Sequence, residues 1–261
     1  AGLRINPGNI GEAWKVAEVV KACAERTLPI RIGVNGGSLE KELLERYGHA
    51  TAEAMVESAL GHIRIVEDLG YDQIKVSLKA SDVQRTVEAY RLLADKVDYP
   101  LHIGITEAGT TWAGTIKSAV GLGVLLYDGI GDTLRVSLTG DPVEEVRVGW
   151  EILKSLQLRQ RGPIFVSCPT CGRCQIDLIS VAEEVESRLQ QLTVPLTIAV
   201  MGCVVNGPGE AREADLGIAG GKEMGLLFRK GEIVRRLPQA ELADALVEEA
   251  LALAERLAED D

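Results

Sequence analysis

Over the first 160 residues, short runs of alternating apolar and polar residues are separated by longer stretches with helical spacing of apolar residues. Alternation with period two predicts β-strands, and apolar spacing near 3.6 predicts amphipathic helices. The expected strands are Leu3–Asn6, Ile30–Asn35, Gln73–Lys79, Leu101–Thr106 and Thr133–Leu138. The expected helices lie near Gly11–Arg26, Leu39–Tyr47, Ala52–Leu69, Asp82–Lys96, Trp112–Tyr127 and Pro142–Leu156.

Strands that alternate with helices in this way form a parallel sheet. Five such units without a dinucleotide-binding fingerprint fit part of a (β/α)8 barrel of the TIM type, which needs eight strands and about 250 residues. Since residues 1–160 supply only five strands, the chain is expected to be a fragment lacking its N-terminal barrel strands. The alternative is an open five-stranded sheet that is complete in itself.

The polar residues of these strands form one face of the sheet, because alternate side chains point to the same side. Burying several cations without partners is costly. An acidic protein with Arg and Lys on the inner face of a barrel is therefore expected to bind an anion there. The polar face carries Arg4, Asn6, Arg31, Asn35, Lys75, Lys79, His102, Thr106, Arg135 and Ser137.

The carboxyl ends of barrel strands hold the active sites of this fold. Asn6, Asn35, Lys79 and Ser137 occupy such ends, and Glu107 is the carboxylate among them, a candidate acid or base or else a salt-bridge partner for Lys79 or Arg135. Two glycine-containing turns follow strands, and their N–H groups are expected to reach phosphate oxygens. These turns are Pro7–Gly11 and Gly36–Ser38.

Residues 161–261 predict a second, small α+β domain, with the boundary near Arg159–Gly162. Strands are expected at Ile164–Val166, Thr197–Met201 and Leu216–Ala219, a hairpin at Lys230–Gly231, and helices from about Asp177 and over 241–255. A domain of about 100 residues is of ordinary size.

Composition narrows the function classes. The formal net charge of −11 argues against a nucleic-acid partner, and no stretch has the length and apolarity of a membrane span. The chain has five cysteines, an odd number. This odd count and the C-x-x-C spacing favour a reducing compartment over a secreted disulfide scaffold. The expected location is the bacterial cytoplasm.

Four of the cysteines lie in two loops. The first is Ser167-Cys-Pro-Thr-Cys-Gly-Arg-Cys174, and the second is Met201-Gly-Cys-Val-Val-Asn-Gly-Pro-Gly-Glu210. Spacing of this kind lets thiolates converge on one soft metal centre. Zinc accepts the same ligands, and a redox disulfide is a third interpretation.

Both loops closely resemble the cluster loops of the 4-hydroxy-3-methylbut-2-enyl diphosphate synthases, iron–sulfur enzymes of the methylerythritol phosphate route to isoprenoids. The resemblance extends over essentially the whole chain. It continues through Leu3–Ile10, Arg31–Asn35, Lys75–Ser81, His102–Gly109 and Gly129–Ser137.

The resemblance implies a reaction. In it, 2-C-methyl-D-erythritol 2,4-cyclodiphosphate is opened and dehydrated to 4-hydroxy-3-methylbut-2-enyl diphosphate with two electrons from a 4Fe–4S cluster. It also implies ferredoxin or flavodoxin as the electron donor. The expected assembly is a homodimer in which one subunit's cluster domain caps the barrel of the other.

The same resemblance implies roles for residues. Cys168, Cys171 and Cys203 would hold the cluster, with Glu210 as a fourth ligand, hard and readily lost from a soft centre. Asn206 would reach the substrate. Positions that match the family's substrate site are Arg31, Asn35, Lys79, Glu107, Arg135 and Ser137.

Cys174 is where spacing and resemblance differ. Spacing alone makes it a ligand, as in ferredoxin runs, whereas the family pattern leaves it free. Two other functions stay open on the residues alone. One is a ferredoxin-type electron carrier, and the other is a zinc-stapled barrel enzyme that acts on a phosphorylated substrate.

Overall fold

The computed structural model describes residues 2–205 and 207–259, and it describes only the backbone of Pro208, Glu210 and Glu259. The chain divides into two compact units, Ala1–Leu158 and Arg159–Asp261. Among the helices that the structure describes, none has both the length and the apolar composition needed to cross a bilayer.

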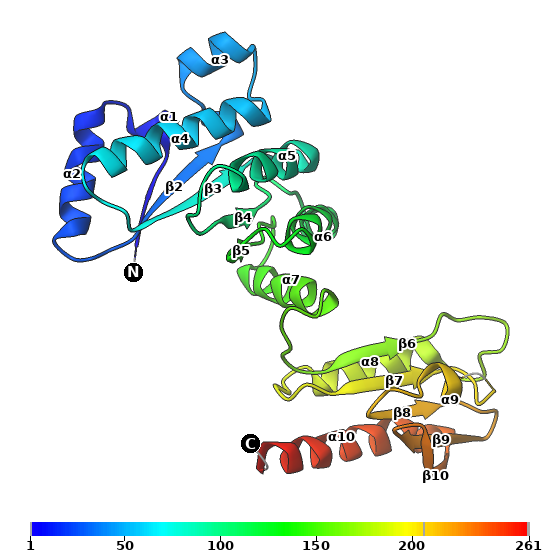
Figure 1. Ribbon diagram of the computed structural model, residues 1–261. Helices are drawn as coiled ribbons and strands as arrows, with labels where there is room; N and C mark the ends of the chain where they lie inside the picture. Colours follow the sequence, from blue (N-terminus) through cyan, green and yellow to red (C-terminus); the bar gives the residue numbers. More distant parts are fainter. Residues whose placement is uncertain (1, 206, 260–261) are drawn as a thin grey trace. The chain divides into compact units, whose positions relative to one another are not determined.

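The first unit alternates strands and helices along the chain, as expected from the sequence (Figure 1). Its strands are β1 (Leu3–Ile5), β2 (Ile30–Asn35), β3 (Ile74–Lys79), β4 (His102–Gly104) and β5 (Thr133–Arg135). Its helices are α1 (Pro7–Ile10), α2 (Ala13–Ala24), α3 (Lys41–Tyr47), α4 (Ala52–Asp68), α5 (Val83–Ala94), α6 (Thr111–Tyr127) and α7 (Pro142–Ser155), with a 3-10 turn, η1, at Gly36–Ser38.

All strand pairs of this unit are parallel. β1 pairs with β2, β2 with β3, and β4 with β5. A parallel bridge between Val76 and Leu101 joins β3 to the residue before β4. In Figure 1, α4, α5, α6 and α7 follow one another along these strands. Mixed α/β architecture with parallel strands is thus confirmed.

The aliphatic residues of β2 and β3 form the core under the helices. Ile30, Ile32 and Val34 are buried with Val76 and Leu78. Alternate residues of the same strands point away from this core, so the prediction that the aliphatic face meets the helices is confirmed.

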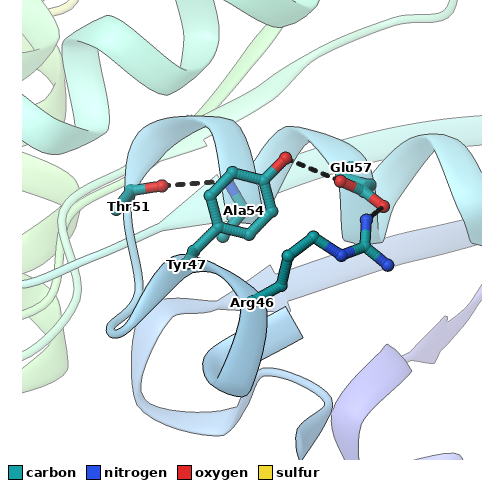
Figure 2. Close-up of polar contacts among 5 residues, drawn as sticks. All are labelled: Arg46, Tyr47, Thr51, Ala54 and Glu57. Atoms are coloured by element: carbon teal, nitrogen blue, oxygen red, sulfur yellow. Dashed lines mark hydrogen bonds and ion pairs between the residues drawn. The ribbon is translucent and has the colours of Figure 1, made fainter. Parts of the chain in front are cut away.

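α3 and α4 are joined by polar contacts at their turn (Figure 2). The Thr51 hydroxyl accepts from the N–H of Ala54 at 3.1 Å and caps α4. Glu57 of α4 accepts from the Tyr47 hydroxyl at 2.7 Å and pairs with Arg46. The short α3 is therefore fastened to the exposed side of α4.

Three expectations about this unit are corrected. The strands expected at 101–106 and 133–138 end at Gly104 and Arg135. The helix expected over 11–26 begins at Ala13. The expected glycine loop Pro7–Gly11 contains the helical turn α1, in which the N–H groups of Asn9 and Ile10 bind the carbonyl of Asn6. Gly8 instead permits close packing, since a Cβ there would lie 1.9 Å from the carbonyl oxygen of Ser38.

The second unit has a five-stranded sheet in the order β10-β9-β8-β7-β6. The strands are β6 (Ile164–Ser167), β7 (Thr197–Met201), β8 (Leu216–Ala219), β9 (Met224–Arg229) and β10 (Glu232–Pro238). The helices are α8 (Leu178–Leu189), α9 (Gly207–Glu210) and α10 (Leu242–Glu259), with a 3-10 turn, η2, at Gln239–Glu241. β6, β7 and β8 are parallel, and β8, β9 and β10 are antiparallel.

The predicted hairpin at Lys230–Gly231 is confirmed, with φ of 47° and 80° at these residues. The predicted start of α8 after Asp177 is also confirmed, since its carboxylate caps the helix at Ser180. Alternate residues of β7 enter the cores on the two faces of this sheet: Ile198 and Val200 on one, Ala199 and Met201 on the other. β7 is thus buried on both sides, and the second cysteine loop begins from a well-packed residue, Met201.

Candidate functional site

The cationic residues of the first unit lie in register on neighbouring strands. Arg4 of β1 pairs with Arg31 of β2, and Arg31 with Lys75 of β3. Asn35 pairs with Lys79 at the carboxyl ends of β2 and β3. Because these residues share one parity, their side chains emerge on the same face.

Arg4 crosses this face over a glycine. Its Nη2 donates to the carbonyl of Gly33 at 2.9 Å, and a Cβ on Gly33 would lie 2.3 Å from Arg4 Nε. With its amide turned so that both ends are satisfied, Asn35 accepts from Arg4 Nη2 at 3.3 Å and donates to the carbonyl of Val34 at 3.2 Å. Any larger residue at position 33 would displace Arg4 from its place beside Asn35.

Lys79 is the most buried of these cations, with only 3% of its surface exposed. Gly104 on β4 leaves room for it, since a Cβ there would lie 3.4 Å from Lys79 Cε and 2.8 Å from the carbonyl oxygen of Arg135. Burial, and then the charges of Arg135, Arg31 and Arg4, lower the pKa of Lys79 to about 7. Within the described chain no carboxylate forms an ion pair with Lys79.

The crowding of these cations also lowers the pKa values of Arg31 and Arg4. Burial lowers the pKa of Arg31, and the charges of Arg4 and Arg135 lower it further. The pKa of Arg4 is lowered by burial and by Arg135. Two buried polar atoms, Asn6 Oδ1 and Arg31 Nη1, have no hydrogen-bond partner among the described residues. Mutually repelling cations with unsatisfied hydrogen-bonding atoms are the arrangement that an anionic ligand would stabilise.

His102 belongs to this cluster; its place on the polar face was expected, but no role in the site was assigned to it. Its Nδ1 lies 2.8 Å from Thr133 Oγ1. Burial, followed by the charges of Lys79, Arg31, Arg135 and Lys75, lowers the pKa of His102 to about 3. The imidazole is therefore neutral at physiological pH and adds hydrogen-bonding capacity without another charge.

Tyr90 is a second residue that sequence reasoning missed. It is fully buried on α5, and its hydroxyl accepts from the N–H of Leu78 at 3.0 Å and donates to the carbonyl of His102 at 2.7 Å. The hydroxyl thus bridges β3 and β4 beside Lys79 and His102. A tyrosine at an apolar position of a helix is a usable signal, because a buried hydroxyl needs a partner.

Glu107 lies just beyond β4, exposed and with a φ of 52°. Backbone of this kind is costly for a residue with a Cβ and clusters at functional sites. The alternative role as a salt-bridge partner is not realised, since Glu107 pairs with neither Lys79 nor Arg135 among the described residues. Ser137 lies two residues beyond β5 and is half-buried, and Asn6 donates to the hydroxyl of Ser38 at 3.0 Å.

The two cysteine loops of the second unit leave adjacent parallel strands. β6 and β7 pair in register up to Ser167 and Val200, so Cys168 and Gly202 begin neighbouring loops. The N–H of Gly202 donates to Cys168 Sγ at 3.2 Å, and the N–H of Gln175 donates to the carbonyl of Gly202 at 2.8 Å. Each loop therefore holds the other.

Cys174 occupies the base of these loops and differs from the other thiols. Its Sγ donates to the carbonyl of Ile176 at 3.3 Å, a bond that a neutral thiol makes. It packs so closely on Gly202 that a Cβ there would lie 2.6 Å from Cys174 Sγ. Cys171 is exposed and Cys203 is buried.

The described side chains include no group of three His, Cys, Asp or Glu gathered for metal binding. Asn206 lies outside the described residues, and so does the side chain of Glu210. The donors nonetheless fit an iron–sulfur group chemically. Three thiols lie on two interlocked loops, and a backbone N–H already points at the sulfur of Cys168, as hydrogen bonds to cluster sulfurs require.

Two family models match the chain. The GcpE TIM-barrel domain matches residues 1–150, and the GcpE protein C-terminal domain matches residues 164–252. Curated relatives named 4-hydroxy-3-methylbut-2-en-1-yl diphosphate synthase (flavodoxin) are similar to it. The protein of Geobacter sulfurreducens is 77% identical over 95% of this chain and 70% of its own length. The protein of Symbiobacterium thermophilum is 64% identical over 94% of this chain and 66% of its own length. The protein of Clostridium perfringens is 60% identical over 95% of this chain and 71% of its own length.

The chain combines an α/β unit of the TIM-barrel type with a second unit that carries the two cysteine loops. This combination is that of the class of iron–sulfur oxidoreductases to which these relatives belong. The chain belongs to the 4-hydroxy-3-methylbut-2-enyl diphosphate synthase (GcpE) family. The family resemblance of the two cysteine loops is thereby confirmed. The roles of the individual site residues stay predictions.

Proposed function

We propose that this chain opens and dehydrates 2-C-methyl-D-erythritol 2,4-cyclodiphosphate to 4-hydroxy-3-methylbut-2-enyl diphosphate in a two-electron reduction. The observation that supports this most directly is Lys79, which is buried beside Arg4, Arg31 and Arg135 and pairs with no carboxylate among the described residues. A cyclic diphosphate brings two negative phosphates to such a cluster and relieves the repulsion among its cations.

In this proposal, β1 to β5 form part of a (β/α)8 barrel, residues 1–160 bind substrate, and residues 161–261 hold the cluster. Arg31, Lys79 and Arg135 bind the diphosphate, while Asn35 and Arg4 orient each other across Gly33. Glu107, which forms no ion pair with any residue that the structure describes and has a strained backbone, serves as the proton donor or acceptor. Asn6, Ser137 and Asn206 supply further hydrogen bonds to substrate.

The cofactor of this proposal is a 4Fe–4S cluster held by Cys168, Cys171, Cys203 and Glu210. When bound, it supplies the electrons for the reduction. The interlocked loops contribute N–H groups that stabilise thiolate charge, as Gly202 does at Cys168. Flavodoxin, which appears in the names of the relatives, or ferredoxin would be the electron donor. The protein would act as a homodimer in the cytoplasm.

Anaerobic purification followed by iron, sulfide and zinc analysis tests the cofactor. Iron and sulfide in comparable amounts, with visible absorption, are expected. Zinc in place of iron would overturn the redox mechanism. Turnover of the cyclodiphosphate with reduced flavodoxin tests the reaction itself, and an iron–sulfur protein that passes electrons without consuming this substrate would be a carrier instead.

Charge reversal tests the binding site. Arg31→Glu and Arg135→Glu should each weaken binding of the cyclodiphosphate by about 10- to 150-fold, the equivalent of roughly 1.5–3 kcal/mol for a hydrogen bond to a charged group. Lys21→Glu makes the same charge change on the exposed part of α2 and is the matched control. Equal losses in all three variants would mean that net charge, rather than this site, governs binding.

A further inference from the structure

Two polar residues, Ser58 and His62, lie on the buried face of α4. Ser58 is 2% exposed and His62 is 8% exposed, whereas the other buried positions of this helix are Ala, Met, Val and Ile. The two residues are four positions apart, so they lie one above the other on one face of the helix. A serine and a histidine at buried positions require polar partners.

Both side chains face the carboxylate of Glu40. The Ser58 hydroxyl donates to this carboxylate and lies 2.8 Å from Oε2 and 3.0 Å from Oε1. His62 Nδ1 lies 3.6 Å from Glu40 Oε1. Burial lowers the pKa of His62, although Glu40 opposes this shift, so the imidazole is neutral at physiological pH. The Glu40 carboxylate is thus anchored to α4 by neutral partners, and chiefly by the Ser58 hydroxyl.

Glu40 is also the residue at which α3 begins. Its backbone carbonyl accepts from the N–H groups of Leu43 and Leu44. The side chain of a residue at this position commonly accepts from an N–H group of the first turn. That of Glu40 makes no such bond to α3, and its hydrogen bonds go to α4 instead. Beginning α3 therefore does not explain why a buried serine serves this carboxylate.

The turn η1, just before Glu40, connects it to the carboxyl ends of the strands. η1 directly follows Asn35, the last residue of β2, and contacts the loop after β1. The Ser38 hydroxyl accepts from Asn6 Nδ2 at 3.0 Å. The backbones also touch, because Gly8 of α1 has no Cβ to collide with the carbonyl oxygen of Ser38. A displacement of Ser38 would therefore move Asn6, one of the residues proposed to bind substrate.

We propose that Glu40 is a positioning residue for the strand-end site, and that it holds Asn6 in place through η1 and the Ser38 hydroxyl. Glu40 contacts no substrate in this proposal. Ser58 fixes the carboxylate of Glu40 on α4, Glu40 fixes the end of η1, and Ser38 fixes the amide of Asn6. Each link is a contact between residues that the structure describes, and the links lead from the buried face of α4 to the end of β1.

This inference rests on the proposed function, because Asn6 binds substrate only under that proposal. The contacts themselves are measured without substrate. The N–H groups of Asn9 and Ile10 donate to the carbonyl of Asn6, so their hydrogen exchange reports how firmly Asn6 is held. The effect on the site is measured by binding of the cyclodiphosphate. The two measurements separate a loosened loop from a protein that does not bind this substrate at all.

Hydrogen exchange of the ligand-free protein tests the contacts. Glu40→Ala should speed exchange of the Asn9 and Ile10 N–H groups by about 2- to 12-fold, the equivalent of roughly 0.5–1.5 kcal/mol for one hydrogen bond. Glu40→Gln keeps an oxygen that accepts from the Ser58 hydroxyl and should exchange like the wild type. Glu42→Ala removes an exposed carboxylate from the first turn of α3 and is the matched control.

Calorimetric titration of the anaerobically purified protein with the cyclodiphosphate tests the effect on the site. Glu40→Ala and Ser38→Ala should each weaken binding by about 2- to 12-fold, while Glu40→Gln and Glu42→Ala should bind like the wild type. Neither Glu40→Ala nor Ser38→Ala should add a further loss to that of Asn6→Ala, because both residues act through Asn6. Urea unfolding followed by circular dichroism checks that every variant is folded.

Additive losses in these double variants would overturn the positioning role, and so would wild-type exchange rates in Glu40→Ala. Faster exchange with unchanged affinity would also overturn it, since Glu40 would then hold the turn without serving the site. If Glu40→Ala does not fold, Ser38→Ala decides the question in the same way at a half-buried hydroxyl. A wild-type protein that does not bind the cyclodiphosphate would instead overturn the proposed function, and the positioning role with it.

Discussion

The N–H of Gly202 points at the sulfur of Cys168 at 3.2 Å, across the ends of β7 and β6. The carbonyl of the same glycine accepts from Gln175, beyond the first cysteine loop. One residue therefore fixes the separation of the two loops, and its missing side chain leaves the space that Cys174 fills. The position of Cys174 is thus a packing position at the root of both loops.

Gly202→Ala should disturb both loops. The added Cβ would lie 2.6 Å from Cys174 Sγ and 3.3 Å from Leu178 Cδ2. Overpacking of this kind costs about 1–3 kcal/mol. We expect a lower urea midpoint and less bound iron in the anaerobically purified protein. The double variant Gly202→Ala/Cys174→Ala removes the closest contact and should recover most of the loss. If the single variant matches wild type in both measurements, the packing role of Gly202 is wrong.

Cys174→Ser should retain the metal content of the wild-type protein, because a hydroxyl can still donate to the carbonyl of Ile176. Cys203→Ser should lose the cluster, since one of three proposed thiolate ligands is removed. Glu210→Gln should keep part of it and turn over poorly. Iron and sulfide analysis with visible spectra compares the three. Loss of iron from Cys174→Ser, with retention in Cys203→Ser, would reverse the ligand assignment.

Local patterns were sufficient to predict the order and faces of the strands, because alternation in β2 and β3 is a property of consecutive residues. The ends of β4 and β5 depend on residues distant in sequence. The N–H of Leu138 binds the Glu145 carboxylate of α7 at 2.8 Å, and that of Thr106 binds the carbonyl of Ala80. No local pattern reveals such partners.

The candidate site shows the same division. Shared parity predicted that Arg4, Arg31 and Lys79 would lie on one face, and the parallel register of β1, β2 and β3 places them there. The depth of Lys79 could not be foreseen, because it depends on Gly104 of another strand. Tyr90 was missed because its role lies in joining β3 to β4 through a helix side chain, a contact that appears only on folding.

Tyr90→Phe should destabilise the first unit. It removes the acceptor for the N–H of Leu78, which is buried, and the donor to the carbonyl of His102, which is partly buried. An unsatisfied buried group costs about 1–3 kcal/mol. Urea unfolding followed by circular dichroism measures the loss. Tyr127→Phe makes the same change at an exposed residue and should have little effect on unfolding. Equal midpoints for the two variants would show that the bridge between β3 and β4 is dispensable.

Lys79→Met should stabilise the ligand-free protein while weakening its binding of the cyclodiphosphate. The folded-state pKa of Lys79, about 7, lies below the ordinary value of 10.5. Between these pH values, unfolding therefore takes up a proton. The buried ammonium group of Lys79 destabilises the folded state fully below pH 7, and this destabilisation is lost as the pH rises toward 10.5. Replacing a buried, unpaired charge by an apolar side chain of similar length should gain on the order of 1 kcal/mol at pH 7.

The measurement is the free energy of unfolding of wild type and variant at several pH values from 7 to 10.5. The wild type should gain stability relative to Lys79→Met across this range, because only the wild type has a buried ammonium group that loses its proton as the pH rises. Lys75→Met is the matched control, as it removes a cation of the same parity from the same strand at a less buried position. An anionic ligand should reverse the order of stabilities, since it binds the wild type more tightly. A Lys79→Met variant less stable than wild type at pH 7 without ligand would mean that Lys79 is already satisfied within the protein, and the anion site would lose its main support.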